Sequence, residues 1–270
     1  FTSYVRATSS QDPMVSYYYL LESLKYHTPK VVVLDGGSLF SNYNVDEQEP
    51  SLRKSIDPLR FSIVKSRLIF DILAQSKTQS FASYFFPILR YHTRWKEINE
   101  KDLYLLFHKD YDPYRGQYIA LNKVTVELPK DFMKPSNDSS AYDERSLKYH
   151  QKIIDTCKKR GISVIYLAFP RTTRSTFEQH NGIKKFADEN NLLFLDYSLP
   201  ELFVEVGFEP LTDLADQNHL NAYGALKFSK HLGKYLDNQF NLPDRRSSLG
   251  FEQWTVDLNR LIQLLNIKVE

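Results

Sequence analysis

The sequence predicts an α/β protein: a three-layer α/β/α sandwich around a parallel sheet, interrupted by a mainly helical insertion. Short aliphatic runs, typical of buried parallel strands, alternate with longer segments whose apolar residues recur at helical spacing. The 270 residues are enough for a sizeable core. Only 9 of them are glycine, and the sequence contains no GxGxxG, GxxxxGK or GxSxG motif. A Gly-rich phosphate-binding loop is therefore not indicated.

The first strands and helix are expected near the N-terminus. Residues 4–7 favour a strand. Asp12 and Pro13 have the pattern of a helix N-cap followed by proline at the first helical position. The apolar face of that helix would consist of Met14, Tyr17, Tyr18, Leu21 and Leu24. The β-branched run 31–34 then predicts a strand covered on both faces, so the segment is a strand–helix–strand unit.

The same pattern recurs twice after residue 140. A helix with an apolar stripe, which includes His150 and Cys157, precedes the aliphatic run 162–168. A second helix over about 176–189 precedes the run 192–196. Because His150 lies on an apolar stripe, we expect it to be a core histidine rather than a ligand. This alternation of helices and strands predicts a doubly wound parallel sheet.

These units divide the chain into three parts. Residues 1–40 and 141–242 form the predicted α/β core, with residues 41–140 as the insertion. Residues 243–270 comprise a linker and an amphipathic helix.

The insertion and the tail are predicted to be mainly helical. Segments 59–73 and 80–95 have helical patterns, and Pro87 is expected to kink or split the second. Residues 118–128 alternate enough for a strand or ribbon. In the tail, the amphipathic helix is expected over about 251–265.

Charge and cysteine content exclude several classes of function. The net charge is +2 without blocks of like charge, so nucleic acid is not an expected partner. The single Cys157 excludes an internal disulfide and a Cys-rich zinc site. His92, His108 and His180 have no spaced partners that suggest metal ligation, and we expect no metal and no cofactor. No apolar run reaches the roughly 18 residues of a membrane helix.

Asp216 and His219 are the candidate catalytic residues. They lie three residues apart, after the predicted strand 192–196 and just before a helix rich in small residues. The expected core-facing stripe of that helix is Ala222, Ala225, Leu226, Ser229, Leu232, Gly233 and Leu236. His231 falls on the opposite side, toward solvent. In an open parallel sheet, reactive groups gather beyond the carboxyl ends of the strands, where this loop must lie.

A carboxylate and an imidazole in such a loop can form the base half of a hydrolytic triad. The Asp orients the ring and supports the imidazolium, and the His removes a proton from a hydroxyl nucleophile. The alternative is a helix-capping Asp216 beside an incidental His219.

At these residues the sequence resembles the SGNH (GDSL-like) hydrolase superfamily. Within this superfamily it resembles the exported branch that includes the lipoteichoic acid D-alanine transfer protein and alginate-type O-acetylation proteins. Residues 216–225 (Asp-Gln-Asn-His-Leu-Asn-Ala-Tyr-Gly-Ala) resemble the last family block, residues 4–11 the second, and residues 31–37 the third. The resemblance covers about half of the chain and implies an SGNH- or flavodoxin-like sheet.

The sequence departs from the family pattern at three places. The family's nucleophilic serine precedes the second block, so the resemblance places it before Phe1. The usual oxyanion glycine is replaced by Ala7 or Ser10, and the third-block asparagine is not found after residues 35–38. The resemblance assigns Ala7, Ser9 and Ser10 to the oxyanion loop, while Ser10 as the nucleophile and a plain strand-to-helix turn stay open.

Arg171 and Arg174 are the candidate substrate-binding residues. They follow the predicted strand 162–168 and could hold an anionic or polyhydroxyl substrate. A solvated loop is the equal alternative.

The resemblance implies an esterase or O-acyltransferase that acts on cell-wall or capsular polysaccharide. It further implies an extracellular or cell-surface protein, membrane-anchored in its full-length form, with a membrane acyltransferase as a possible partner. The alternative is a noncatalytic glycan-binding or scaffolding protein that keeps the fold.

Overall fold

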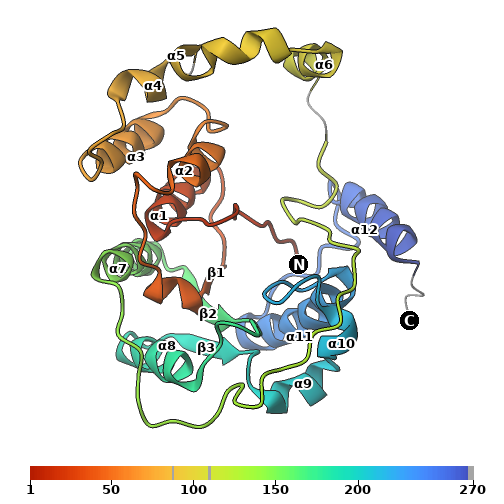
Figure 1. Ribbon diagram of the computed structural model, residues 1–270. Helices are drawn as coiled ribbons and strands as arrows, with labels where there is room; N and C mark the ends of the chain where they lie inside the picture. The colour runs from red at the N-terminus through yellow and green to blue at the C-terminus, as the bar shows by residue number, and fades with distance from the viewer. Residues whose placement is uncertain (87, 109–110, 267–270) are drawn as a thin grey trace.

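The computed structural model is a mixed α/β protein built on a three-stranded parallel sheet (Figure 1). The structure describes residues 1–86, 88–108 and 111–266. Strands β1 (Val31–Asp35), β2 (Ser163–Ala168) and β3 (Leu193–Asp196) lie side by side in chain order. Val33 pairs with Ile165 of β2, and Ile165 pairs in turn with Leu193 of β3. The three strand segments expected from the aliphatic runs are therefore confirmed.

Alternate side chains of β2 enter two different cores. Val164 and Tyr166 pack with residues of α7 (Glu144–Lys158) and α8 (Phe177–Glu189). Ile165 and Leu167 pack with residues of α11 (Ala222–Phe240). The central strand thus has apolar cover on both of its faces, which is why its sequence is an unbroken apolar run.

A third core lies beside the sheet and consists mainly of helices from the first half of the chain. Residues of α1 (Pro13–Ser23) pack there with residues of α2 (Glu49–Ile56) and α3 (Ile63–Leu73). The expected N-cap is confirmed, since the Asp12 carboxylate accepts a hydrogen bond from Met14 N at 2.8 Å. Arg145 of α7 binds both oxygens of the buried Asp12, at 2.9 and 2.5 Å. This fork joins α1 to α7.

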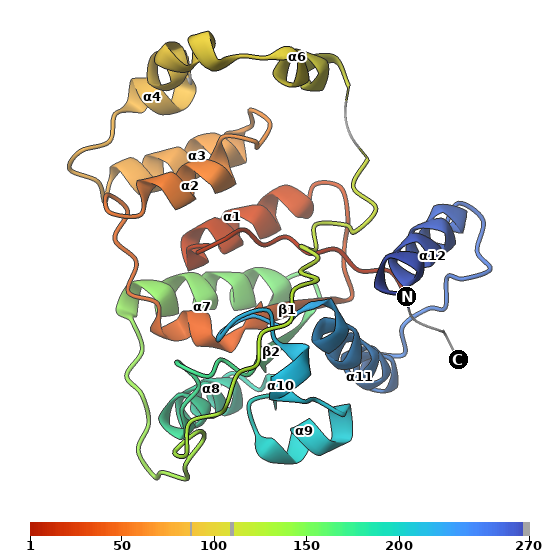
Figure 2. The same ribbon diagram turned by 45° about the vertical axis from the view of Figure 1, so that its right-hand side comes forward.

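The remaining elements are short. Figure 2 shows α4 and α6 at the outer end of the molecule, beyond α2 and α3. The bounds are η1 (Gly36–Phe40), α4 (Phe81–Phe85), α5 (Ile88–Tyr91), η2 (His92–Glu97), α6 (Glu100–Phe107), α9 (Pro200–Val206), α10 (Pro210–Asp213) and α12 (Glu252–Leu265). The helix expected over 80–95 is divided as anticipated between α4 and α5, although Pro87 itself lies outside the described residues.

Two expected strands are wrong. Neither residues 4–7 nor residues 118–128 belong to a strand. Their backbones bond to loops and turns instead of to the sheet: Val5 N donates to Arg115 O at 3.1 Å, and Val124 N donates to Leu214 O at 3.1 Å. The composition of these segments favours a strand, but pairing with a sheet is a tertiary property that depends on neighbouring elements.

Two expectations about burial are also wrong. Val33 of β1 is 41% exposed, although β1 was expected to be covered on both faces. On α11, Ala222 and Leu236 of the expected stripe are buried, but Phe228 is buried as well and Ser229 is exposed. The core-facing stripe is therefore rotated toward the larger aromatic residue. As a consequence His231 is half-buried, with its Nδ1 2.8 Å from the Tyr197 hydroxyl.

The expectation that His150 is a core residue is confirmed. It is 2% exposed, and burial lowers the pKa of its imidazole to about 4. The Ser38 hydroxyl donates to the Asp35 carbonyl at 2.5 Å. Its oxygen can therefore accept from His150 Nε2 at 2.9 Å, while Nδ1 accepts from the Tyr166 hydroxyl at 2.7 Å. This network suits a neutral ring.

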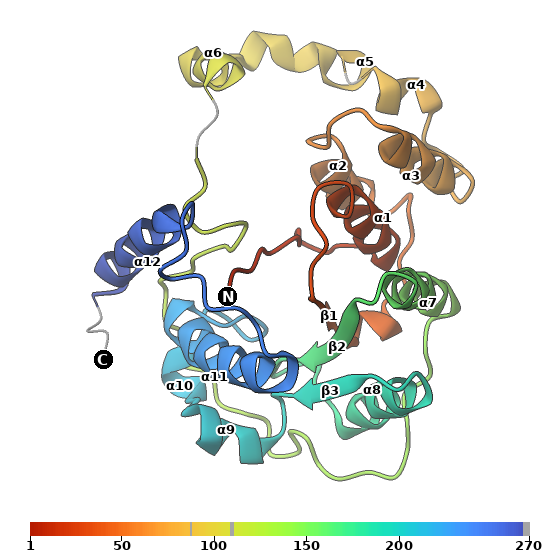
Figure 3. The ribbon, with the colours of Figure 1, turned by 180° about the vertical axis from the view of Figure 1, so that it is seen from behind.

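Figure 3 shows α12 beside the N-terminal segment. Trp254 of α12 packs edge-on against Tyr4, and the Arg115 guanidinium lies 3.7 Å from the centre of the Trp254 ring. Arg115 also binds the buried Asp257 at 2.6 Å. Within the described ranges, no helix has the length and hydrophobicity required to cross a bilayer.

Candidate functional site

The candidate site lies at the carboxyl ends of the three strands. Asp35 ends β1, Ala168 ends β2 and Asp196 ends β3. The register places these ends together, because Asp35 pairs with Leu167, and Ala168 pairs with Asp196. Two carboxylates therefore project from one edge of the sheet, where ligands bind in open parallel sheets.

The loop that follows β2 joins the other two strand ends. The Arg171 guanidinium binds the Asp35 carboxylate at 2.5 Å. Arg171 N donates to the Ser175 hydroxyl oxygen at 3.0 Å, and the Ser198 hydroxyl donates to the same oxygen at 3.1 Å. Loop 169–175 is thus fixed to the last residue of β1 and to the segment that follows β3.

The same loop also holds the segment that carries Asp216 and His219. Thr172 donates through both N and Oγ1 to Gln217 O, each at 2.8 Å. Thr173 Oγ1 donates to Asn218 Oδ1 at 2.7 Å. These bonds place the predicted pair beside the carboxyl end of the central strand, as its position in the sequence suggested.

Asp216 and His219 form the close contact expected from their spacing. The His219 Nδ1 lies 2.9 Å from both Asp216 carboxylate oxygens. A tight turn holds them, because Ala215 N donates to His219 O and Asn218 N donates to the Asp216 carboxylate, at 2.8 and 2.7 Å. Desolvation raises the pKa of Asp216, but the Asn218 N–H and the His219 ring outweigh it and hold the pKa below its ordinary value.

This arrangement leaves the opposite ring nitrogen available. A bond from Nδ1–H to the carboxylate puts the proton on Nδ1, so Nε2 carries the lone pair of a base. The side chains of Asp216 and His219 are 57% and 76% exposed, so solutes reach the pair freely. Among the described residues, no hydroxyl group is within hydrogen-bond distance of His219.

The predicted oxyanion residues lie in another environment. Ala7, Ser9 and Ser10 are exposed, and Ser10 has a positive φ of 51°. Thr8, between them, bonds to Gln11 and contacts Ser55 of α2 at 2.5 Å. None of the described hydrogen bonds or ring contacts joins residues 7–10 to Asp216 or His219.

The two predicted substrate-binding arginines differ in their availability. Arg171 is paired with Asp35, so its guanidinium is already partly neutralised. Arg174 is exposed, and its guanidinium has no partner in the described part of the chain. Arg174 is thus the cation beside the Asp216–His219 loop that is free to meet an anionic group.

A second Asp–His pair lies at the same edge and was missed by the sequence analysis. The His180 Nδ1 of α8 is 2.8 Å from the Asp196 carboxylate, whose other oxygen accepts from Ser198 N at 2.8 Å. The Asp196 side chain is 3% exposed and that of His180 is 14% exposed. Together with Arg171 and Ser175 they line a small cavity. The helix 176–189 and the strand that ends at Asp196 were both predicted, and their topology could have revealed the pair.

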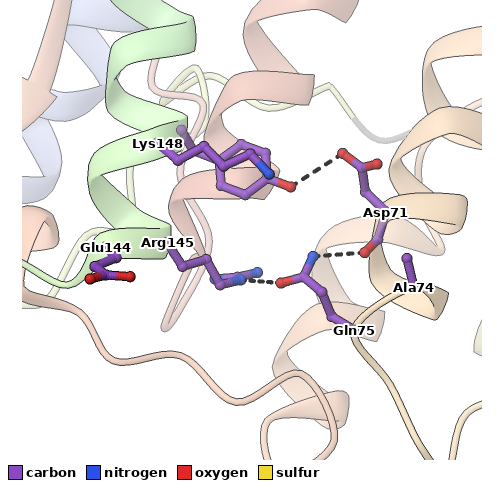
Figure 4. Close-up of a pocket in the computed structure, with 7 residues that line it drawn as sticks. Asp71, Ala74, Gln75, Glu144, Arg145 and Lys148 are labelled. Atoms are coloured by element: carbon purple, nitrogen blue, oxygen red, sulfur yellow. Dashed lines mark hydrogen bonds between the residues drawn. The ribbon is translucent and has the colours of Figure 1, made fainter.

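A larger cavity of about 430 Å³ lies between α3 and α7 (Figure 4). Its Asp71 carboxylate accepts hydrogen bonds from the hydroxyls of Tyr18 and Tyr149, at 2.7 and 3.2 Å. Arg145 is engaged by Asp12 and by the Gln75 side chain. Most polar groups here already have partners, and none of the predicted site residues lines this cavity, so we place the candidate site at the sheet edge.

No cluster of three or more potential metal ligands occurs among the described residues. No protein-family model, curated protein or solved structure matches the chain.

Proposed function

We propose that the protein is an SGNH-type esterase or O-acyltransferase that acts on a cell-envelope polysaccharide. The observation that supports this most strongly is the Asp216–His219 pair, which combines an oriented imidazole with an accessible Nε2 beside the end of a parallel strand. The proposal includes a three-layer α/β/α sandwich of the SGNH type.

In the proposed reaction, His219 is the general base and Asp216 orients it. His219 Nε2 takes the proton of a serine hydroxyl as the serine oxygen bonds to the acyl carbon. The imidazolium returns this proton to the leaving oxygen of the acyl donor, so an acyl-enzyme forms and the leaving group is released; in the esterase reaction this leaving group is the polysaccharide hydroxyl. Water or a second sugar hydroxyl then removes the acyl group by the same proton transfers in reverse. This chemistry requires neither a metal nor a cofactor.

The expected substrates are cell-wall or capsular polysaccharides, with Arg174 placed to meet an anionic group on them. A membrane acyltransferase would supply the acyl group in the transfer reaction, and the protein would act at the cell surface. These three points rest on the family resemblance, as does the serine nucleophile expected before Phe1.

Fluorophosphonate labelling of the full-length protein tests the proposal. We expect a single labelled serine, identified by peptide mapping, and loss of labelling in His219→Ala. His27→Ala is the matched control, because His27 is also exposed. Labelling that survives in His219→Ala would exclude His219 as the base, and labelling of Ser10 would show that Ser10 is the nucleophile.

A noncatalytic glycan-binding protein is the second candidate. The observation that favours it is the exposure of Asp216, because the Asp of a hydrolytic triad is typically buried. This function predicts polysaccharide binding by a full-length protein that fluorophosphonate does not label.

A further inference from the structure

The segment from Arg60 to Lys96 is strongly basic. It contains seven Lys or Arg residues and one acidic residue, Asp71, and so carries a net charge of +6, whereas the whole chain carries +2. The remaining residues are therefore net acidic. Positive charge is concentrated in the part of the protein that includes α3 and α4.

This basic segment also exposes a cluster of phenylalanine rings. Phe81 and Phe85 of α4 stack with their centres 4.2 Å apart. Phe70 of α3 lies 5.8 Å from Phe81, and Phe61 lies 5.8 Å from Phe85. Phe61 is 74% exposed and Phe70 is 55% exposed. Contiguous exposed apolar surface of this kind marks an interaction site in a folded protein.

Helix α3 has one buried face and one exposed face, and the exposed face carries both apolar and cationic side chains. Its buried face consists of Lys65, Leu68, Ile69 and Ile72. On the opposite face Ile63, Arg67 and Phe70 follow one another at helical spacing, and all three are exposed. Apolar side chains and a cation thus share one exposed stripe, and Phe81 and Phe85 of α4 contact it at Phe70.

Three exposed cations of this region are unpaired. The side chains of Arg60, Arg67 and Lys77 have no acidic partner among the described residues, and each is exposed. By contrast, Arg90 of α5 is bound to Glu49 at 2.6 Å. Unpaired cations beside exposed apolar residues fit a partner that is both negatively charged and apolar.

We propose that this region, the α3–α4 surface, binds the interface of an anionic lipid bilayer. Phe61, Ile63 and Phe70 would enter the boundary between headgroups and acyl chains, while Arg60, Arg67 and Lys77 contact the lipid phosphates. The α3–α4 surface lies at the outer end of the molecule, away from the sheet (Figures 1 and 2), so the candidate site would stay open to solvent.

A bilayer explains this surface better than a nucleic acid. Bases bind by stacking on open aromatic faces, but Phe81 and Phe85 already stack on each other. Ile63, Ile88 and Leu89 are also exposed and cannot stack on a base. Mixed aliphatic and aromatic residues with interspersed cations are typical of helices that lie in a membrane interface. The inference does not depend on the proposed esterase activity.

Vesicle flotation tests the proposal. Wild type should bind vesicles of phosphatidylcholine with about 30% phosphatidylglycerol, should bind pure phosphatidylcholine weakly, and should dissociate from the anionic vesicles at high salt. Each exposed cation is expected to contribute about fivefold in affinity, so the triple variant Arg60→Gln, Arg67→Gln, Lys77→Gln should bind about 100-fold more weakly. The variant Phe61→Ser, Ile63→Ser, Phe70→Ser should lose binding to a similar extent.

Matched substitutions on other surfaces provide the control. Lys230→Gln with Lys234→Gln removes two exposed cations from α11, and Leu249→Ser removes an apolar side chain that is 94% exposed. Circular dichroism checks that every variant is folded. Wild-type protein that ignores anionic vesicles, or α3–α4 variants that bind like the controls, would overturn the proposal. Self-association that the Phe variant abolishes, without vesicle binding, would identify the surface as a protein interface instead.

Discussion

The two Asp–His pairs at the carboxyl edge have almost the same geometry in very different surroundings. The Nδ1–carboxylate distance is 2.8 Å in His180–Asp196 and 2.9 Å in Asp216–His219. Asp196 is buried and its second oxygen accepts from Ser198 N. Asp216 lies in an exposed turn, and its imidazole partner is open to solvent.

Because of this difference in burial, we expect the His180–Asp196 pair to contribute to stability and the Asp216–His219 pair to take part in the reaction. A carboxylate buried at a strand end must keep its partners, since an unpaired buried charge is strongly unfavourable. An exposed pair contributes little to folding, but its free nitrogen is accessible to a substrate. The distance between two groups therefore does not assign a role, whereas burial and accessibility do. We expect the two pairs to respond in opposite ways to substitution.

The largest expected effect is on the rate. His219→Ala in the full-length protein should lower kcat/KM for an aryl acetate ester by about 10⁴-fold or more, because the general base is lost. Its free energy of unfolding should stay within about 0.5 kcal/mol of wild type. Ester turnover and urea denaturation measure the two quantities, with His27→Ala as the control. If His180→Ala abolished turnover while His219→Ala did not, the buried pair would be the reactive one.

The next effect is on stability and concerns the buried pair. Asp196→Ala removes a carboxylate that binds His180 and the Ser198 N–H, and we expect a loss of about 4 kcal/mol in the free energy of unfolding. Asp216→Ala is the matched substitution and should cost less than about 1 kcal/mol. Urea denaturation of both variants provides the comparison. Equal losses would mean that the exposed turn is as structural as the buried pair.

The sequence predicted the elements of the core well because their signals are local. Asp12 and Pro13 mark the start of α1, and the aliphatic runs mark all three strands. The strand expected over residues 4–7 failed, because Val5 bonds to a loop residue far along the chain. The buried stripe of α11 is rotated from the expected one because Phe228, which was not among the expected core residues, packs with Ile165 and Leu167 of β2. Strand pairing and the buried face of a helix depend on packing partners, which cannot be read from the spacing of residues in the sequence.

Half of the candidate site was predictable for the same reason. Asp216 and His219 are three residues apart, so a single turn brings them together. His180 and Asp196 belong to different elements, and only the position of α8 on the sheet makes them neighbours. In a parallel sheet the N-terminal turn of a covering helix lies at the carboxyl edge, so this contact follows from topology rather than from a motif.

His150 extends the comparison to a histidine that is buried without a carboxylate. Burial lowers its pKa to about 4, whereas the unfolded chain titrates near 6.5. Between these two values the unfolded state binds more protons than the folded state. The free energy of unfolding is therefore unaffected by His150 above pH 6.5 and decreases as the pH falls toward 4. We expect a loss of about 3 kcal/mol over this range.

Urea denaturation between pH 7 and 4 measures this loss, and His150→Gln should flatten the profile over that interval. A steep profile that persists in His150→Gln would assign the acid sensitivity to other groups.

The smallest expected effect on stability decides whether the exposed pair is functional or structural. Asp216→Asn keeps an oxygen that can accept from Asn218 N, but it removes the charge beside His219. Because the pair is exposed, the free energy of unfolding should fall by about 0.5 kcal/mol or less. The ester rate should nevertheless fall by several orders of magnitude, since the ring loses the carboxylate that fixes its tautomer. A loss of stability above about 2 kcal/mol with an unchanged rate would show that Asp216 shapes the turn and takes no part in the chemistry.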